Sequence, residues 1–349
     1  MGLGRTIALK GATFLGVLLA VLLIVVVTLG ATGLSDNILR SLIGEELREQ
    51  RQTLSIILRD PEELERVIDA RRQELIKFYG LDEPWYHRLP STVWMVLTLD
   101  LGSARTLRSF TGSSRVADIV LERLPNTILL VTTALAISSM IGLFLGTKLA
   151  TKVGSRMDRA ISYLSAVSYA LPTWWIGILL IVVLSFRLNL FPLSGMYSIP
   201  PPATHLERLL DLLWHSTLPI LTLVFVTFGG WAYAVRTLVL NVAQEDFVNV
   251  ARAKGLPEGL VRRRYVLRVA APPIVTNIIL GLAGSLGGAI LTETVFNWPG
   301  MGRLYYDAVL ALDETVIIAL TFIFTLIYII ARFCLEVLYV ILDPRVRYR

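Results

Sequence analysis

The side chains that most often carry catalysis or bind metals are few and scattered in this chain. No histidine lies in a His-Glu-x-x-His pattern, and no serine lies in a Gly-x-Ser-x-Gly turn. The stretch 142–148 approaches a phosphate-loop motif, but its two glycines are separated by three residues rather than four. A single cysteine, Cys334, permits neither an intrachain disulfide nor a zinc pattern. The sequence therefore predicts no catalytic residue, no metal ligand and no cofactor-binding residue. We expect the three histidines to be solvated or interfacial: His87, His205 and His215.

Four charged residues lie nearest to the long apolar stretches: Arg236, Glu293, Arg332 and Glu336. A charge buried in a membrane often marks an ion pathway. Here each residue lies toward an end of its stretch, and Arg332 and Glu336 are four residues apart, so one helix face can pair them. We expect ion pairing or snorkelling to the interface, with proton coupling as the alternative.

The elements that would carry these residues are membrane spans. Hydrophobic residues make up 54% of the chain and charged residues 17%, and the mean hydropathy is +0.65, which is unlike an ordinary soluble protein. About 20 apolar residues cross a bilayer, and six uncharged windows approach or exceed that length: 11–35, 124–147, 160–186, 212–235, 269–292 and 315–331. The window 188–206 carries four prolines and is interpreted as a loop. The sequence thus predicts an all-α polytopic membrane protein with six transmembrane helices.

The distribution of basic residues predicts the orientation of these spans. With the N-terminus inside, 16 Lys and Arg residues flank the spans on the cytoplasmic side, against three in the short outer loops. Because cationic flanks stay cytoplasmic, both termini are expected there. The alternative for the first window is a cleaved signal peptide, although its apolar stretch exceeds the usual length of about 7–15 residues. The net charge of +6 is explained by this topology and not by nucleic-acid binding.

Three parts follow from this topology: a cytoplasmic N-terminus with the first span (1–33), an external domain (34–123) and a five-helix core (124–349) that carries a cytoplasmic loop at 236–271. The external segment holds 13 basic and 15 acidic residues, too many for the bilayer. Asp60 and Pro61 predict the start of an amphipathic helix that runs to Tyr79. Its expected apolar row is Leu64, Val67, Ile68, Leu75, Ile76 and Tyr79. The uncharged stretch 89–99 is too short to span and is expected at the interface.

The loop between the fourth and fifth windows carries a short amphipathic segment. Phe247, Val250, Ala251 and Lys254 share one helical face, and Gly255 is positioned to end that helix. A second, basic segment follows. This pattern is typical of a knob that docks into a partner protein, and equally of a basic helix that lies on anionic lipid.

The residues of this loop resemble the permease loop of ATP-binding-cassette (ABC) importers of the dipeptide/oligopeptide/nickel subfamily. The resemblance extends continuously over about 114–347. It rests on four motifs: Asp246-Phe247-Val248 with Ala251 to Leu256, Glu293 to Leu304, Glu122 to Thr127, and the tail Leu342 to Arg347. It implies a type I importer permease fold in a prokaryotic cell (inner) membrane. It also implies a second, homologous permease, two ABC ATPases that bind ATP and magnesium, and an external substrate-binding protein. Membrane lipid surrounds such a subunit, which is itself no enzyme.

The resemblance also assigns roles to particular residues. The loop that couples to the ATPases would comprise Asp246, Phe247, Val250, Ala251, Arg252, Ala253, Lys254, Gly255 and Leu256. An external loop motif would comprise Glu293, Trp298, Pro299, Gly300 and Gly302. Four glycines of the fifth window permit close helix packing or line the pathway: Gly281, Gly284, Gly287 and Gly288.

The substrate expected from the resemblance is a di- or oligopeptide, and the alternatives are oligosaccharides or nickel chelates. Two functions of other classes remain open. An ATP-independent secondary carrier would commonly show repeated halves and charges at the midplane, and neither is evident here. A membrane-anchored receptor would need fewer than six spans.

Overall fold

A computed structural model of the protein describes residues 3–58, 60–79, 81–87, 89–150, 153–285 and 289–342. The regular secondary structure of this described part is helical, and no β-strand occurs in it. It divides into two compact units, one formed by 8–119 with 307–326 and the other by 120–306 with the two chain ends. Each unit is described by itself.

Four helical stretches are long and apolar enough to cross a membrane: Ala8–Ala31, Val116–Ala150, His205–Ala243 and Glu314–Val337. They belong to α1 (Leu3–Ala31), the run of α5 (Val116–Thr127), η2 (Ile128–Thr132) and α6 (Thr133–Ala150), α9 (His205–Ala243) and α15 (Glu314–Leu342). A bent pair of helices makes a fifth if it is counted as one span. The expected window 269–292 falls on α12 (Arg268–Ser285), which is not among these stretches, so the count of six spans stays a prediction.

The third window is not one straight helix. It contains α7 (Arg156–Ala170), then α8 (Thr173–Leu180) with its π-helical continuation η3 (Ile181–Arg187), and the chain bends by 98° between them. The cause is Pro172, because a proline disfavours helical geometry in the residue before it, and Leu171 has φ −85° and ψ 131°. The interpretation of 188–206 as a loop is confirmed, because that window is irregular until the capping box at Thr204 starts α9.

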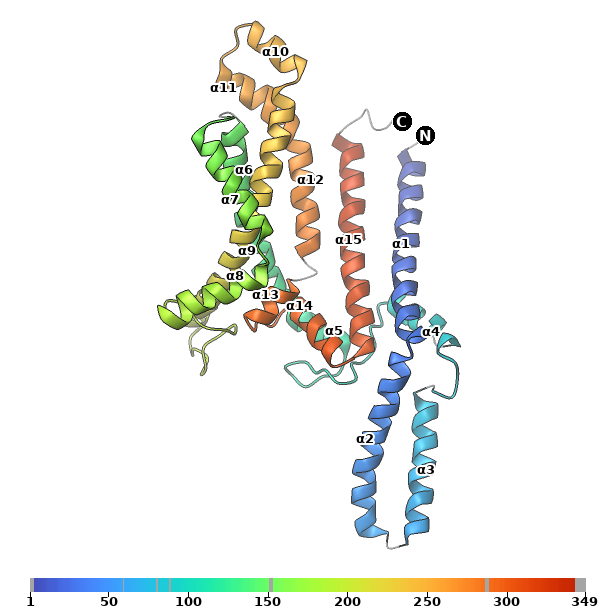
Figure 1. Ribbon diagram of the computed structural model, residues 1–349. Coiled ribbons are helices and arrows are strands. Elements are labelled where there is room, and N and C mark those ends of the chain that lie inside the picture. The colour runs from blue at the N-terminus through green and yellow to red at the C-terminus, as the bar shows by residue number, and fades with distance from the viewer. Residues whose placement is uncertain are drawn as a thin grey trace. The chain divides into compact units, whose positions relative to one another are not determined.

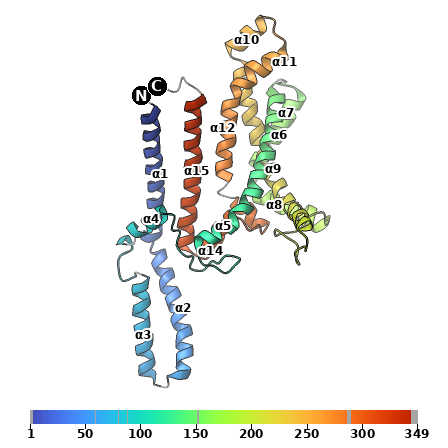
Figure 2. The same ribbon diagram turned by 180° about the vertical axis from the view of Figure 1, so that it is seen from behind.

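Helices α6 and α9 lie side by side in both views (Figures 1 and 2). Two glycines one turn apart make this approach possible. A Cβ at Gly142 would lie 2.8 Å from the carbonyl carbon of Trp231, and one at Gly146 would lie 2.8 Å from the carbonyl oxygen of Ala232. The pair that looks like an incomplete phosphate loop in the sequence is therefore a helix-packing site.

A buried ion pair joins α7 to α9. Arg236 donates from Nε to Asp158 Oδ1 over 2.8 Å and from Nη2 to Oδ2 over 2.9 Å. The amide of Gly154 donates to the same Oδ2 over 2.9 Å. Pairing is thus confirmed for Arg236, as expected for a charge at the end of a span, and the bidentate geometry fixes where α7 begins beside α9.

The unit formed by 8–119 with 307–326 contains an antiparallel hairpin of α2 (Leu34–Ile57) and α3 (Pro61–Phe78), followed by η1 (Trp85–His87) and α4 (Leu89–Leu97). The expected start of α3 is confirmed, because the Asp60 carboxylate accepts from the amide of Glu62 over 3.0 Å and Pro61 takes the first position. Ile68 and Leu75 are buried against Leu39, Ile43 and Leu47 of α2. Leu64, Ile76 and Tyr79 pack against the same cluster, so most of the expected apolar row faces α2, and Val67 is the exposed member of the row at 42%.

Two further contacts define local structure. Asp313, just before α15, accepts through Oδ2 from the amides of Arg105 and Thr106 over 2.7 and 2.8 Å, which ties the loop after α4 to the start of that helix. His215 is buried in α9, and its Nδ1 lies 2.9 Å from the carbonyl oxygen of Asp211. The expectation of a solvated or interfacial histidine is wrong there, because one helical turn supplies a partner that makes burial tolerable.

Candidate functional site

The loop after α9 folds as a helix, a turn and a second helix. It comprises α10 (Asp246–Ala253), then α11 (Glu258–Leu260) and the π-helical η4 (Val261–Leu267), which continues into α12. Val248 and Ala251 are fully buried in a cluster with Val235 and Val239 of α9 and Val261 of η4. The inner face of α10 is therefore anchored in the helical core, and its outer face is left open.

The expected coupling residues divide between these two faces. Ala251 is buried and Leu256 is partly buried on the same cluster. The remaining seven are exposed: Asp246, Phe247, Val250, Arg252, Ala253, Lys254 and Gly255. Phe247 and Val250 are 41% and 53% exposed. The outer face of α10 thus exposes two apolar side chains to solvent, Phe247 and Val250, while its inner face is packed against α9 and η4.

The turn after α10 is defined by a glycine conformation and an ion pair. Gly255 has φ +74°, in the left-handed region that side chains with a Cβ rarely adopt. Arg252 donates to both carboxylate oxygens of Glu258, from Nη2 over 3.1 Å and from Nε over 3.3 Å, and so bridges the turn. The hydrogen bond from Arg252 is also the chief reason that the pKa of the Glu258 carboxyl is lowered. The turn is therefore a defined structure.

A second group of predicted residues forms a buried network between α13 (Ile290–Val295) and the start of α14 (Met301–Leu310). Glu293 and Trp298 are fully buried. Glu293 Oε1 accepts from the Thr127 hydroxyl over 2.9 Å, and Oε2 accepts from the amide of Arg303 over 2.9 Å. The amide of Met301 in turn donates to Thr127 Oγ1 over 2.7 Å. The carboxylate thus connects α14 to the end of α5.

The other residues of this motif complete the same connection. Trp298 Nε1 donates to the carbonyl of Asn126 over 3.0 Å, and Asn126 Nδ2 donates to the carbonyl of Pro299 over 2.8 Å. A Cβ at Gly300 would lie 2.5 Å from Thr127 Oγ1, and one at Gly302 would lie 2.8 Å from the amide nitrogen of Ile290. Two motifs about 170 residues apart in the sequence are therefore parts of one clamp, which we call the Glu293 network: Asn126, Thr127, Glu293, Trp298, Pro299, Gly300 and Gly302.

Two of the four glycines predicted for the fifth window lie within the described residues. Gly281 lies in α12 where a Cβ would be 3.3 Å from a methyl carbon of Leu135 and 3.4 Å from the Trp231 ring, so it permits α12 to approach α6 and α9. Gly284 lies in the last turn of α12. Gly287, Gly288 and the tail motif after Leu342 lie outside the described residues.

A cavity of about 580 Å³ opens at the bend between α7 and α8. It is lined by α9 and α12 as well, and combines aromatic and small polar side chains: Tyr169, Leu171, Pro172, Thr173, Val226, Thr227, Gly230, Trp231, Ala234 and Asn277. Its lining carries no charge. Sequence reasoning missed this site, although Pro172 in the middle of the window 160–186 was a signal for the break.

Within the described ranges, no three His, Cys, Asp or Glu side chains are grouped to hold a metal ion. The two prominent features of the described residues are the anchored α10 knob with its exposed apolar side chains and the Glu293 network between helices.

Comparison with known proteins decides the family. The model of the family described as "binding-protein-dependent transport system inner membrane component" matches residues 138–348. The chain belongs to this family. It is a multi-pass membrane component of a transport system, and the match includes both the α10 knob and the α13–α14 side of the Glu293 network.

Similar proteins carry related names. The oligopeptide transport system permease protein AppB of Bacillus subtilis (strain 168) is 29% identical over 322 residues, which cover 92% of this chain and 96% of that protein. The di/tripeptide transport system permease protein DppB of Pseudomonas aeruginosa (strain UCBPP-PA14) is 31% identical, with 85% and 92% covered. The dipeptide transport system permease protein DppB of Escherichia coli (strain K12) is 30% identical, with 80% and 86% covered. The similarity therefore includes most of the segment before residue 138.

Proposed function

We propose that this chain is one transmembrane half of an ABC importer for di- and oligopeptides. The observation that carries the substrate class is that similar proteins over most of the chain are named as peptide permeases. In the proposed assembly a homologous second permease completes the pathway, two ABC ATPases bind ATP and magnesium, and an external binding protein delivers the substrate. The chain itself would hydrolyse nothing.

The α10 knob is the proposed contact with an ATPase. Exposed Phe247 and Val250 supply apolar surface for a cleft, while Val248 and Ala251 fix the knob to α9 and η4. A movement of the knob would therefore be transmitted to the spans and not absorbed by a loose loop. A basic helix lying on lipid remains the alternative, and the fixed turn at Gly255 favours docking, because binding to a lipid surface does not require a sharp reversal.

The cavity at the bend is the proposed part of the pathway in this half. Its uncharged lining of aromatic rings, hydroxyls and the Asn277 amide suits peptides of varied sequence, since it offers stacking surface and hydrogen bonds without selecting a charge. The second permease would close the open side. Closure and opening would then alternate as the ATPases move the knobs.

Transport by the reconstituted complex tests this function. The chain, co-expressed with the permease and ATPases encoded beside it, is placed in vesicles with the adjacent binding protein and offered labelled dipeptides, oligosaccharides and nickel chelates. We expect ATP-dependent uptake of peptides. Uptake of another ligand class would correct the substrate, and uptake without ATP or ATPases would contradict the proposal in favour of a secondary carrier.

A further inference from the structure

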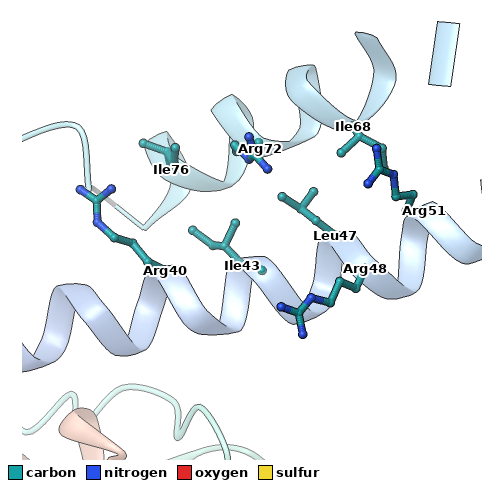
Figure 3. A pocket seen from close by; sticks show the side chains of 9 residues that line it. Arg40, Ile43, Leu47, Arg48, Arg51, Ile68, Arg72 and Ile76 are labelled. Atoms are coloured by element: carbon teal, nitrogen blue, oxygen red, sulfur yellow. The ribbon is translucent and has the colours of Figure 1, made fainter. Parts of the chain in front are cut away.

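A groove lies on the α2–α3 hairpin, within the unit formed by 8–119 with 307–326. It has a volume of about 420 Å³ and is lined by nine residues: Arg40, Ile43, Gly44, Leu47, Arg48, Arg51, Ile68, Arg72 and Ile76. Figure 3 shows the aliphatic side chains of the two helices facing one another, with Arg40 and Arg51 toward opposite ends and Arg72 between them. The groove therefore combines an apolar floor with a basic rim.

The charge of this rim is incompletely neutralised by the hairpin itself. None of the nine lining residues is acidic. Arg51 contacts Glu65, and Arg72 Nη1 lies 3.4 Å from Asp69 Oδ1. Arg40 and Arg48, both exposed, have no acidic partner within the part of the chain that the structure describes. An acidic ligand would supply the missing charge.

Gly44 keeps the middle of this surface open. Glycine weakens the interior of a helix, and its presence usually reflects close packing. Here a Cβ would meet no atom within 4 Å, so the packing of the chain does not require it. Gly44, Arg40 and Arg48 also line an adjoining recess with Asn37, Ser41 and Glu45. A larger side chain at position 44 would obstruct the place where the groove and the adjoining recess meet.

Three arginines of α2 form the basic row of the groove: Arg40, Arg48 and Arg51. The length of this row argues that the ligand is a protein and not a lipid headgroup. Helix α2 starts at Leu34, directly after α1, and leads on from its end (Figure 1). From Arg40 to Arg51 a helix rises about 16 Å, at 1.5 Å per residue. One headgroup layer is only about 5–8 Å thick. The row thus extends past the layer that lipid could occupy.

We propose that this groove docks an acidic segment, carrying apolar side chains, of the external substrate-binding protein. The inference rests on the proposed function, which requires such a receptor, and on the predicted orientation, which places the hairpin outside. Salt bridges to the rim would steer and orient the receptor, and apolar side chains would fill the floor. The partner is identified here by its chemistry: carboxylates spaced over about 16 Å beside aliphatic groups.

Receptor binding to the intact complex tests the groove. The full importer complex in nanodiscs of phosphatidylcholine alone is titrated with the labelled binding protein encoded beside it. We expect the double variant Arg40→Glu/Arg48→Glu to raise the Kd about tenfold and to flatten its dependence on salt. Gly44→Leu should weaken binding similarly by filling the groove, without loss of helix stability.

The control is Arg66→Glu, which reverses one charge, where the double variant reverses two, on α3 at an 81% exposed side chain outside the groove. It should leave the Kd unchanged. If the wild type binds and all variants bind equally, the groove proposal fails while the proposed function stands. If the wild type does not bind the receptor, both fail. If the variants bind the receptor like the wild type in phosphatidylcholine nanodiscs and differ from it only in nanodiscs that contain phosphatidylglycerol, the ligand is lipid and the proposal is overturned.

Discussion

At the scale of single residues, the buried carboxylate of Glu293 is the centre of the Glu293 network. A charge-capable group is tolerated in the interior when hydrogen-bond donors surround it. Glu293 receives donors from three separate places: the Thr127 hydroxyl and the amides of Ala289 and Arg303. Its role is thus to hold three segments together, and the expectation of snorkelling does not describe it.

Removal of this carboxylate should destabilise the Glu293 network. Glu293→Ala leaves the donors of Thr127, Ala289 and Arg303 without their acceptor, and each buried unsatisfied group costs about 1–3 kcal/mol. We expect a lower melting temperature of the detergent-solubilised protein. Glu293→Gln, which retains one acceptor oxygen, should lose less. Glu62→Ala is the control because that carboxylate is 84% exposed. Equal melting temperatures of Glu293→Ala and wild type would show that the Glu293 network does not stabilise the protein.

At the scale of elements, the sequence predicts what local chemistry determines. The start of α3 follows from Asp60 and Pro61, and the turn after α10 follows from Gly255, because caps and left-handed turns depend on neighbouring residues. The bend at Pro172 was also local, but a count of uncharged residues does not register it. Helix α9 begins before its apolar window, because a capping box starts it at Thr204 and charged residues are compatible with a helix end.

The long-range hydrogen-bond partners of buried side chains could not be predicted from neighbouring residues in the sequence. Nothing near Glu293 in the sequence indicates that Thr127 is its partner, and nothing near Arg236 indicates Asp158. In the same way, the pattern of α10 placed Phe247 and Ala251 on one face, whereas Ala251 is buried and Phe247 is exposed, because the position of α9 decides which side faces inward. Family resemblance predicts a coupling role for this loop, and the geometry divides the loop into an anchoring and an exposed face.

The turn of the knob gives the prediction at this scale. Gly255→Val puts a β-branched residue at φ +74°, where it is strongly disfavoured, and should displace α10 from its ATPase. We expect the permeases to insert and pair, but with less ATPase co-purified or with ATP hydrolysis no longer stimulated by substrate. Gly259→Val is the matched control, since both glycines have open space around a Cβ and only Gly255 has positive φ. Similar effects of the two variants would contradict docking through this turn.

At the scale of the whole molecule, orientation decides which function each part can serve. The groove of the hairpin can meet a receptor only outside, and the knob can meet an ATPase only inside. The 16 to 3 bias of basic residues predicts this arrangement. The geometry of the two units does not contain that information, because a helix crosses a bilayer equally well in either direction, whereas flanking charges distinguish the two sides.

Cysteine labelling in intact cells measures the orientation directly. The exposed Cys334 is first replaced by serine to give a background without thiols. Glu62→Cys, at an 84% exposed position at the start of α3, should then react with an impermeant maleimide. Gly259→Cys, exposed in the loop after α10, should react only after the membrane is permeabilised. Ser113→Cys is a weaker reporter, because the Ser113 hydroxyl is held 2.6 Å from Asp118 Oδ2 and the position is partly buried. Reversed labelling would place the knob outside, where no ATP-driven partner could reach it, and would exclude the coupling mechanism together with receptor docking on the hairpin.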